Sequence, residues 1–297
     1  SMRSVIYLME SNLIKAKEEI LDGLKKDNNN FDLLYNLGYI YEQEENYKRS
    51  YFIYIKAKEN TKNEEENNDI EEAISRVKEL LSKCKEKNIS SYKFAKSERY
   101  YSIKSSNDSM SCDPFFIIGC GRSGSTLIRS VLNAHDDISI PPENITLANM
   151  VDEYNKLNYL AWEDLIKIVF DAFKKNPQYN FWKLDLDKVY NKLLKLGENK
   201  RTLRKIIDII YMTFAEENFP KAIRWGDKTP LNSLNIDLID QVFENAKYIH
   251  LIRDGRDVVS SYLNSTTYVN DVEVASKRWL RHIDKASELG KMKDEDH

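Results

Sequence analysis

Hydrophobic positions along this chain follow two patterns, and the change between them comes near residue 114. Before about residue 88, apolar side chains recur every three to four positions and strand-like runs are nearly absent, which predicts helices. After residue 114, short apolar runs alternate with longer stretches of helical periodicity. The pattern predicts a helical domain over residues 1–88, a linker rich in Ser, Lys and Tyr over 89–113, and a second domain over 114–297.

The helical region repeats itself at an offset of 34 residues. Small or apolar residues occupy both members of three pairs: Ala16 and Ser50, Ile20 and Tyr54, Gly23 and Ala57. This offset is the tetratricopeptide period, and residues 31–64 resemble one such unit, although Ser50 replaces the usual alanine and Lys62 the usual proline. Residues 11–24 are then the second helix of a preceding unit.

Beyond this unit, an acidic run over 60–69 is expected to be a solvated loop, and an apolar stripe over 70–84 predicts a capping helix outside the repeat register. One and a half repeats fall short of the three that a solenoid usually needs. The region is therefore either a peptide-binding groove or a helical brace for the next domain, and we favour the brace.

The second half of the chain predicts an α/β domain. Apolar runs over 115–118, 138–140, 222–225 and 248–252 predict four strands. Helical periodicity lies between them, near 124–134, 145–156, 161–175, 184–196, 201–217 and 234–244. The alternation predicts a mainly parallel, P-loop-type sheet flanked by helices, preceded by the all-α tetratricopeptide-like domain.

Composition narrows the class of protein. A chain of 297 residues with 41% hydrophobic residues can bury a large core, and a net charge of −3 gives no sign of a nucleic-acid-binding coat or a polybasic membrane arm. No apolar run approaches the roughly 18 residues of a transmembrane helix, and no signal-peptide core is seen. Cys84, Cys112 and Cys120 lack disulfide or zinc spacing. We expect a soluble cytoplasmic protein that binds neither nucleic acid nor membrane.

The run over 114–129 joins a predicted strand to a predicted helix through a glycine-rich turn. Gly119, Gly124 and Thr126 fit the nucleotide template G-x-x-x-x-G-K-[ST], while Ser125 takes the place of its lysine. The missing lysine argues against an ordinary ATPase or kinase. Small residues before a helix N-terminus still suit an anion, and Arg122 supplies a cation, although such turns also serve packing alone.

Polar residues follow each of the four predicted strands. The first strand is followed by the loop of Arg122, the second by Glu143, the third by Lys228 and the fourth by Arg253. Because parallel strands deliver these loops to one edge of the sheet, we expect the side chains to surround a common cleft. Cations, hydroxyls and one carboxylate together are the groups expected for transfer of an anionic group.

From residue 114 to about 285 the chain resembles the sulfotransferases that use 3′-phosphoadenosine-5′-phosphosulfate, most closely the tyrosylprotein type with a glutamate base. Gly-Arg-Ser-Gly-Ser-Thr at 121–126 is similar to the 5′-phosphosulfate loop, and Arg253 with Ser261 eight positions later matches the 3′-phosphate pair. Glu143 falls where the tyrosylprotein enzymes have their catalytic carboxylate. Lys228 matches their lysine beside the sulfuryl group.

The resemblance implies sulfuryl transfer from this donor to a hydroxyl, leaving adenosine 3′,5′-bisphosphate and needing no metal. It implies Glu143 as base and Arg122 with Lys228 as electrostatic catalysts. Residues implied in donor binding are Arg122, Ser123, Gly124, Ser125, Thr126, Arg253 and Ser261. The acceptor stays open between a tyrosine in a protein or peptide, a carbohydrate and a small molecule, and the helical repeats could bind a protein partner.

Family domains generally extend further beyond the arginine–serine motif than this chain, which has 36 residues after Ser261, so we expect a C-terminally truncated domain with part of its site missing. Rival functions are a P-loop nucleotide or phosphate transferase and a non-catalytic, repeat-mediated interaction protein.

Several candidate residues also have purely structural interpretations. Glu143 could cap the helix near 145, and Lys228 could pair with Asp227. The other residues with a structural interpretation are the charged neighbours Arg253, Asp254, Arg256 and Asp257, which could pair locally, His135 and His250, and the core aromatics Trp225 and Trp279.

Overall fold

The computed structural model describes residues 7, 12–83, 100–106, 110, 112–265 and 271–293. The chain divides into two compact units. The first, called the helical unit below, comprises Ser1–Tyr101 and Asn155–Leu165, and the second, the α/β unit, comprises Ser102–Tyr154 and Ile166–His297. This division differs from the predicted boundaries, because the helical unit takes in a segment from the second half of the chain. Much of the predicted linker, residues 89–99, 107–109 and 111, lies outside the described residues.

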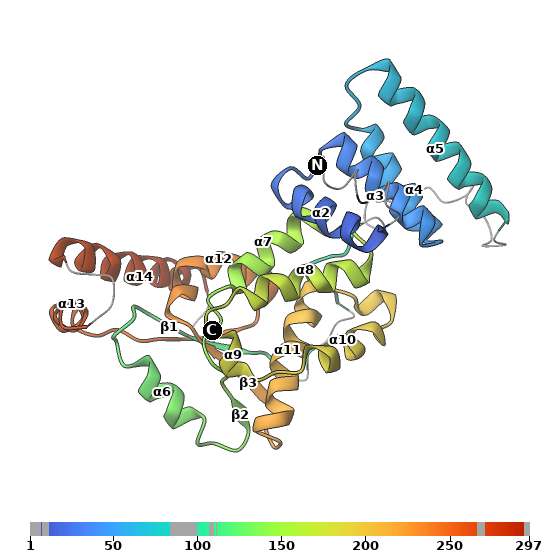
Figure 1. Ribbon diagram of the computed structural model, residues 1–297. Coiled ribbons are helices and arrows are strands. Elements are labelled where there is room, and N and C mark those ends of the chain that lie inside the picture. Colours follow the sequence, from blue (N-terminus) through green and yellow to red (C-terminus); the bar gives the residue numbers. More distant parts are fainter. Residues whose placement is uncertain are drawn as a thin grey trace. The chain divides into compact units, whose positions relative to one another are not determined.

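In the described N-terminal residues of the helical unit, the successive helices are α2 (Leu13–Lys26), α3 (Phe31–Gln43), α4 (Tyr47–Lys58) and α5 (Glu64–Lys83) (Figure 1). An asparagine side chain caps the start of each of the first three. Asn12, Asn30 and Asn46 each accept a hydrogen bond from the backbone N–H three residues later. Asparagine is a preferred N-cap because its side-chain oxygen satisfies an N–H group that has no partner within the helix. These local signals set where the helices begin.

The repeat positions pack as the offset of 34 predicts. Both members of the first two pairs, and Ala57 of the third, are fully buried. A Cβ on Gly38 of α3 would lie 2.5 Å from the ring of Tyr54 on α4, so the close approach of these helices needs glycine there. The hydroxyl of Ser50 donates to the Gly38 carbonyl across 2.8 Å. The helical N-terminal region is compatible with the tetratricopeptide-like resemblance.

The prediction of a solvated loop over 60–69 is wrong from Glu64 onward, because α5 begins there. The Asn63 side chain accepts from the N–H of Glu66 across 2.8 Å, and the Glu66 carboxylate accepts from the N–H of Lys62 across 2.6 Å. This reciprocal capping starts the helix, and three glutamates in its first turn complement the positive end of the helix dipole. The acidic run that suggested a loop therefore contains the N-terminus of a helix.

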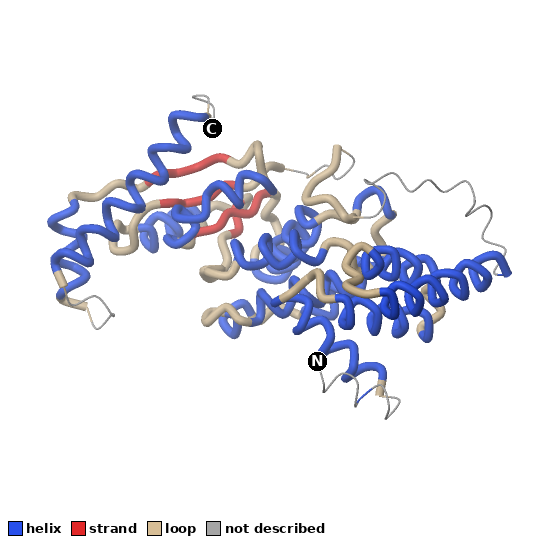
Figure 2. Tube along the Cα trace, turned by 90° about the horizontal axis from the view of Figure 1, so that it is seen from above, coloured by secondary structure: helices blue, strands red, loops and turns tan. Residues whose placement is uncertain are grey.

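The α/β unit is built on a four-stranded parallel sheet of order β2-β3-β1-β4, which confirms the predicted fold class. The strands are β1 (Phe115–Ile118), β2 (Ile138–Ser139), β3 (Arg224–Lys228) and β4 (Lys247–His250), and they run side by side in Figure 2. The third strand was predicted to end at Trp225, and this is wrong. Asp227 and Lys228 pair with Phe116 and Ile117 of β1.

The remaining helices begin and end within two residues of the predicted stretches where a prediction was made. They are α6 (Ser125–Leu132), α7 (Leu147–Leu157), α8 (Trp162–Lys174), α9 (Tyr179–Trp182), α10 (Leu186–Leu194), α11 (Leu203–Asn218), α12 (Ile236–Val242), α13 (Gly255–Leu263) and α14 (Val272–Met292), with 3-10 turns η2 (Glu198–Lys200) and η3 (Pro230–Asn235). None of the helices in the described part of the chain has the length and apolar character to cross a membrane.

The two faces of the sheet are covered by different helices. Phe115 and Ile117 of β1 share a buried cluster with residues of α6. Phe116, which points to the other face because side chains alternate along a strand, contacts the rings of Trp225 and Phe243. Burial on both faces explains why β1 is a continuous apolar run. It also holds the loop after β1 between α6 and the end of the sheet.

Candidate active site

The sheet order decides which of the candidate loops are neighbours. Because β2 lies beside β3, the loop carrying Glu143 adjoins the end of β3, where Lys228 is the last residue. Because β1 lies beside β4, the glycine-rich loop adjoins the segment of Arg253. Lys228 pairs with Ile117 of β1, two residues before Gly119, so both groups lie at the same edge of the sheet.

The loop after β1 has an unusual backbone. Gly119 has φ +137° and Gly124 has φ +92°, both in the region that favours glycine. A Cβ on Gly119 would also lie 2.4 Å from the carbonyl oxygen of Leu251, after β4. Arg122 adopts φ +70°, which is uncommon for a residue with a side chain. Such a conformation strains the backbone and is found most often at functional sites. The spacing of glycines is therefore a backbone requirement of this turn.

Arg122, Arg253 and Ser261 come together in the structure. The Arg122 Nε donates to Ser261 Oγ across 3.0 Å, and Arg253 Nη1 donates to the Arg122 carbonyl across 3.1 Å. Arg253 also lies 3.5 Å from the carboxylate of Asp257, so the local pairing foreseen for this segment is present beside the contact with the loop. Ser261 thus contacts the loop cation, and Arg253 contacts the loop backbone.

The second charged pair of that segment is Arg256 with Asp254, at 2.6 Å. Both are exposed, and exposed ion pairs contribute little to stability. Hydrogen bonds from Arg256 lower the pKa of Asp254 to about 2. Asp254 also caps the start of α13, because its side chain accepts from the backbone N–H of Arg256.

Glu143 and Lys228 form an ion pair between Oε1 and Nζ. The Lys228 side chain is only 4% exposed, whereas that of Glu143 is 24% exposed, so the carboxylate is the member of the pair that solvent can reach. The Glu143 backbone is held on both sides, because its N–H donates to Gln178 Oε1 across 3.1 Å and its carbonyl accepts from Asn176 Nδ2 across 2.7 Å. These contacts fix a solvent-facing carboxylate against a buried ammonium.

A model of the Sulfotransferase family matches residues 114–294, which is more than half of the chain. The chain belongs to the sulfotransferase family. The matched residues contain all four strands and the entire candidate site.

Curated relatives of this chain include two animal proteins. Protein-tyrosine sulfotransferase A of Caenorhabditis elegans is 24% identical over 184 residues, covering 60% of this chain and 42% of the relative. Protein-tyrosine sulfotransferase of Drosophila melanogaster is 23% identical over 163 residues, covering 55% and 28%. The chain spans less than half the length of these curated relatives.

Among solved structures, the sulfotransferase domain from the Synechococcus PCC 7002 olefin synthase aligns with 65% of this chain and 66% of its own. Its sequence identity is 23% and its TM-score 0.41.

The family implies a nucleotide sulfate donor, and the glycine-rich loop of this chain fits a phosphate group. Ser123 Oγ is buried and has no hydrogen-bond partner, so it is available to a polar atom of a bound ligand. A Cβ on Gly124 would meet nothing within 4 Å, which leaves open space at the N-terminus of α6. The N–H groups of Ser125 and Thr126, at the start of that helix, have no acceptor within it, as is usual at a helix N-terminus. Ser125 and Thr126 open the helix and add hydroxyls.

Sequence reasoning missed three further residues of this candidate site. Arg129 donates its Nε to the Ile140 carbonyl across 3.1 Å, on the segment leading to Glu143. Burial lowers the pKa of Arg129 below its ordinary value, although the negative charges of Glu143 and Asp227 oppose this shift. Arg129 lies on α6, the helix that directly follows the glycine-rich loop, and a cationic residue so close to this loop was the available signal. Asp227 and Tyr211, the other two, are described below.

The histidines of the described α/β unit are placed away from Glu143 by their contacts. His250 lies in β4, where burial lowers its pKa, and His135 follows α6, with its Nδ1 accepting from the Asp137 N–H across 3.2 Å. His282 of α14 is fully buried, its Nδ1 lies 2.6 Å from Ser233 Oγ, and burial lowers its pKa to about 4. The contacts of His135 and His282 are with Asp137 and Ser233 rather than with the candidate base, and a structural role for His135 and His250 stays a prediction.

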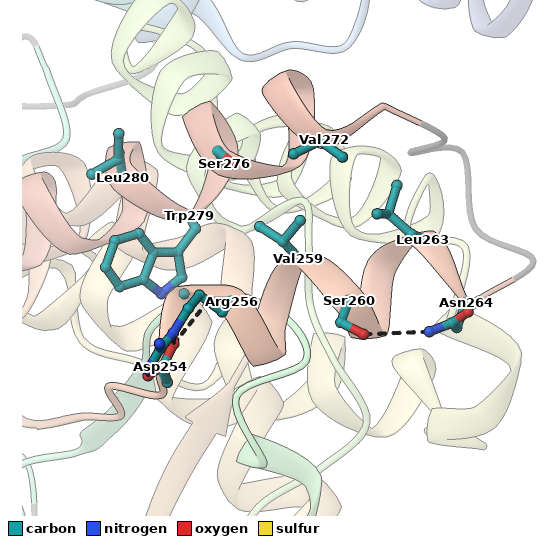
Figure 3. Close-up of a pocket in the computed structure, with 11 residues that line it drawn as sticks. Asp254, Arg256, Val259, Ser260, Leu263, Asn264, Val272, Ser276, Trp279 and Leu280 are labelled. Carbon is teal, nitrogen blue, oxygen red and sulfur yellow. Dashed lines mark hydrogen bonds and ion pairs between the residues drawn. The ribbon is translucent and has the colours of Figure 1, made fainter.

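A groove of about 690 Å³ lies between α13 and α14 (Figure 3). Its apolar lining includes Val259, Leu263, Trp279 and Leu280. Helical periodicity puts Val259 and Leu263 on the face of α13 opposite Ser261. The groove therefore opens away from the contact between Ser261 and Arg122.

Among the described residues, no group of three or more His, Cys, Asp or Glu side chains could hold a metal ion.

Proposed function

We propose that this chain transfers a sulfuryl group from 3′-phosphoadenosine-5′-phosphosulfate to a hydroxyl acceptor. The observation that carries the proposal is the ion pair between Glu143 and buried Lys228, at the sheet edge where the glycine-rich loop also ends. A carboxylate that can accept a proton and a cation that can stabilise developing negative charge are the two groups that such a transfer requires.

The donor, when bound, supplies the activated sulfuryl group and a phosphate as its leaving group. The backbone N–H groups of 122–126 and the hydroxyls of Ser123, Ser125 and Thr126 would hold its 5′-phosphate. Arg253 and Ser261 would hold its 3′-phosphate, with the guanidinium offering fork geometry and the hydroxyl one further hydrogen bond. Both now contact the loop through Arg122, which is consistent with one continuous anion site.

Glu143 would accept the proton of the acceptor hydroxyl. The ionised carboxylate is the form that accepts a proton, and it is also the form that pairs with Lys228. Arg122 and Lys228 would stabilise the charge that builds on oxygen atoms during the transfer. By analogy with phosphoryl transfer, positioning and charge stabilisation dominate the chemistry of such reactions.

The acceptor we propose is a tyrosine hydroxyl in a protein or peptide. The support is the name of the relatives, which are protein-tyrosine sulfotransferases. The helical unit would either bind such a partner or brace the α/β unit, and a cytoplasmic location stays a prediction. A carbohydrate or small-molecule acceptor is an outcome of the test below.

A transfer assay with radiolabelled sulfate donor tests the function. Tyrosine-containing peptides and a lysate of the source organism are offered as acceptors, and labelled peptide is expected. Label found only in carbohydrate or small molecules would overturn the proposal of a tyrosine acceptor. Magnesium-dependent turnover of ATP without sulfate transfer would overturn the donor and favour a nucleotide or phosphate transferase.

Glu143→Gln tests the base. The rate of transfer is expected to fall about 10²- to 10⁴-fold, because proton transfer by a positioned side chain contributes that much. Calorimetry should show unchanged binding of adenosine 3′,5′-bisphosphate. Glu217→Gln is the matched control, since Glu217 is 28% exposed and pairs with Lys188 at 2.9 Å. Unchanged transfer in Glu143→Gln would exclude this residue as the base.

A further inference from the structure

Backbone pairing does not by itself hold Glu143 against Lys228. The ladder between β2 and β3 pairs Ile138 with Arg224 and Ser139 with Trp225. Strand β2 ends there, four residues before Glu143, while β3 continues for three residues to Lys228, paired with β1 on its other side. The distance between the carboxylate and the ammonium must therefore be fixed by side chains.

The sequence neighbours of the pair meet on one tyrosine. Asn144 follows Glu143, and its Nδ2 donates to the hydroxyl oxygen of Tyr211 across 3.4 Å. Asp227 precedes Lys228, and its Oδ2 accepts from the Tyr211 hydroxyl across 2.6 Å. Tyr211 lies on α11, outside both strands. One hydroxyl group thus links the loop after β2 to the end of β3.

A second link runs parallel to the first. The backbone N–H of Asn144 donates to Thr229 Oγ1 across 2.9 Å. The other carboxylate oxygen of Asp227 accepts from Asn232 Nδ2 across 2.7 Å. Asn144, Tyr211 and Thr229 are fully buried, and Asp227 is 1% exposed. In such an environment a broken hydrogen bond leaves a polar group without water as a replacement, so the arrangement is strongly preferred.

The tyrosine ring is itself held in place. Its centroid lies 4.2 Å from that of Trp225 on β3 and 5.1 Å from that of Trp182 on α9. Burial also raises the pKa of Tyr211 well above its ordinary value, so the hydroxyl keeps its proton and remains a donor to Asp227. The hydroxyl position is therefore set by the packing of the ring as well as by its hydrogen bonds.

We propose that Tyr211 is a positioning residue for the Glu143–Lys228 pair, acting through Asn144 and Asp227, with Thr229 as the second link. The catalytic consequence rests on the function proposed above. Tyr211 is fully buried and would touch neither donor nor acceptor. Its effect comes from geometry, because small displacements of catalytic groups cost large factors in rate.

Tyr211→Phe removes the linking hydroxyl and keeps the packed ring. We expect kcat to fall about tenfold or more while the affinity for adenosine 3′,5′-bisphosphate stays unchanged, because the donor loop is untouched. Tyr41→Phe is the matched control. The Tyr41 hydroxyl is also fully buried and donates to Asp164 across 2.6 Å, but in the helical unit. An unchanged kcat in Tyr211→Phe, or an equal loss in Tyr41→Phe, would overturn the proposal.

A readout independent of activity separates the positioning role from the proposed function. The urea midpoints of Tyr211→Phe, Glu143→Gln and the double variant are compared by tryptophan fluorescence. Shifts that fail to add are expected, since coupled residues are not additive, whereas Tyr41→Phe with Glu143→Gln should add. Additive shifts for Tyr211 would refute the link, even in an active enzyme.

Two further outcomes are also decisive. An unaltered protein that transfers no sulfate but shows non-additive shifts would refute the proposed function and leave the link standing. If Tyr211→Phe does not fold, Thr229→Val takes its place in both measurements with the same expectations. This variant is nearly isosteric and removes the acceptor of the Asn144 N–H.

Discussion

The Asp227 carboxyl group lies buried at the end of β3, where its environment opposes ionisation. Burial raises its pKa from the ordinary 3.8 to about 6, although hydrogen bonds from Tyr211 and Thr229 lower it. The folded protein therefore holds this proton at pH values where the unfolded chain has lost it. The resulting stabilisation is fully present below about pH 4 and is lost as the pH rises through about 6.

Asp227→Asn should remove this pH dependence. The interval from 3.8 to about 6 corresponds to at most about 3 kcal/mol. Between pH 4 and pH 7 the free energy of unfolding of the unaltered protein should therefore fall by up to that much relative to the variant. Urea unfolding at several pH values measures the difference. Parallel curves for the two proteins would show that Asp227 does not titrate in this range.

Two glycines of the loop after β1 should respond differently to alanine. Gly124→Ala places a side chain at φ +92° in open space, so only backbone strain of about 1–2 kcal/mol is expected. Gly119→Ala adds a collision with the Leu251 carbonyl oxygen at 2.4 Å, so a larger loss is expected. Thermal unfolding measures both. Equal losses would mean that the close approach to Leu251 relaxes without cost.

At the scale of elements, the periodicity of hydrophobic residues in the sequence predicted most of the helices and strands that form. The errors came where polar residues are used structurally. Residues 64–69 seemed too acidic for a helix, but Asn63 and Glu66 cap its start. Asp227 and Lys228 seemed too polar for a strand, but each is buried against a partner of its own. Local patterns report burial of apolar residues and cannot report burial that depends on distant partners.

Helix packing makes a testable distinction between two helical glycines. Gly38→Ala would place a methyl group 2.5 Å from the Tyr54 ring, so overpacking should cost about 1–3 kcal/mol. Gly290→Ala, near the end of α14, meets nothing within 4 Å and should stabilise by about 0.5–1 kcal/mol through helix propensity. Chemical denaturation of both variants tests this. Stabilisation by Gly38→Ala would contradict the close contact of α3 and α4.

At the scale of the whole molecule, the helical unit is not continuous in sequence. Within it, the Tyr41 hydroxyl donates to Asp164 across 2.6 Å and Lys17 pairs with the same carboxylate at 3.0 Å. Arg49 donates to the Tyr159 carbonyl across 2.5 Å. These partners come from Asn155–Leu165, more than 100 residues away in the chain. No composition change marks that segment, so the sequence could not reveal its place.

A fragment of residues 1–113 should therefore fold poorly. Without Asn155–Leu165 the Tyr41 hydroxyl loses its carboxylate acceptor and Lys17 keeps only its pair with Glu44, and an unpaired polar group in a buried position is costly. Circular dichroism should show a less cooperative transition at lower temperature than in the full chain. Adding a peptide of residues 155–165 should raise the temperature of this transition. A fragment that melts like the full chain would show that this segment is dispensable.

The sequence alone determined the helical and α/β halves, the four strands, the glycine-rich loop and the candidates Glu143, Lys228 and Arg253. These follow from periodicity, from turns that require glycine and from motifs read within short windows. Only the tertiary structure decided that Ser261 contacts Arg122 and that Tyr211 joins the neighbours of Glu143 and Lys228. Such contacts depend on strand order and on helices that return from far along the chain, and no local pattern contains that information.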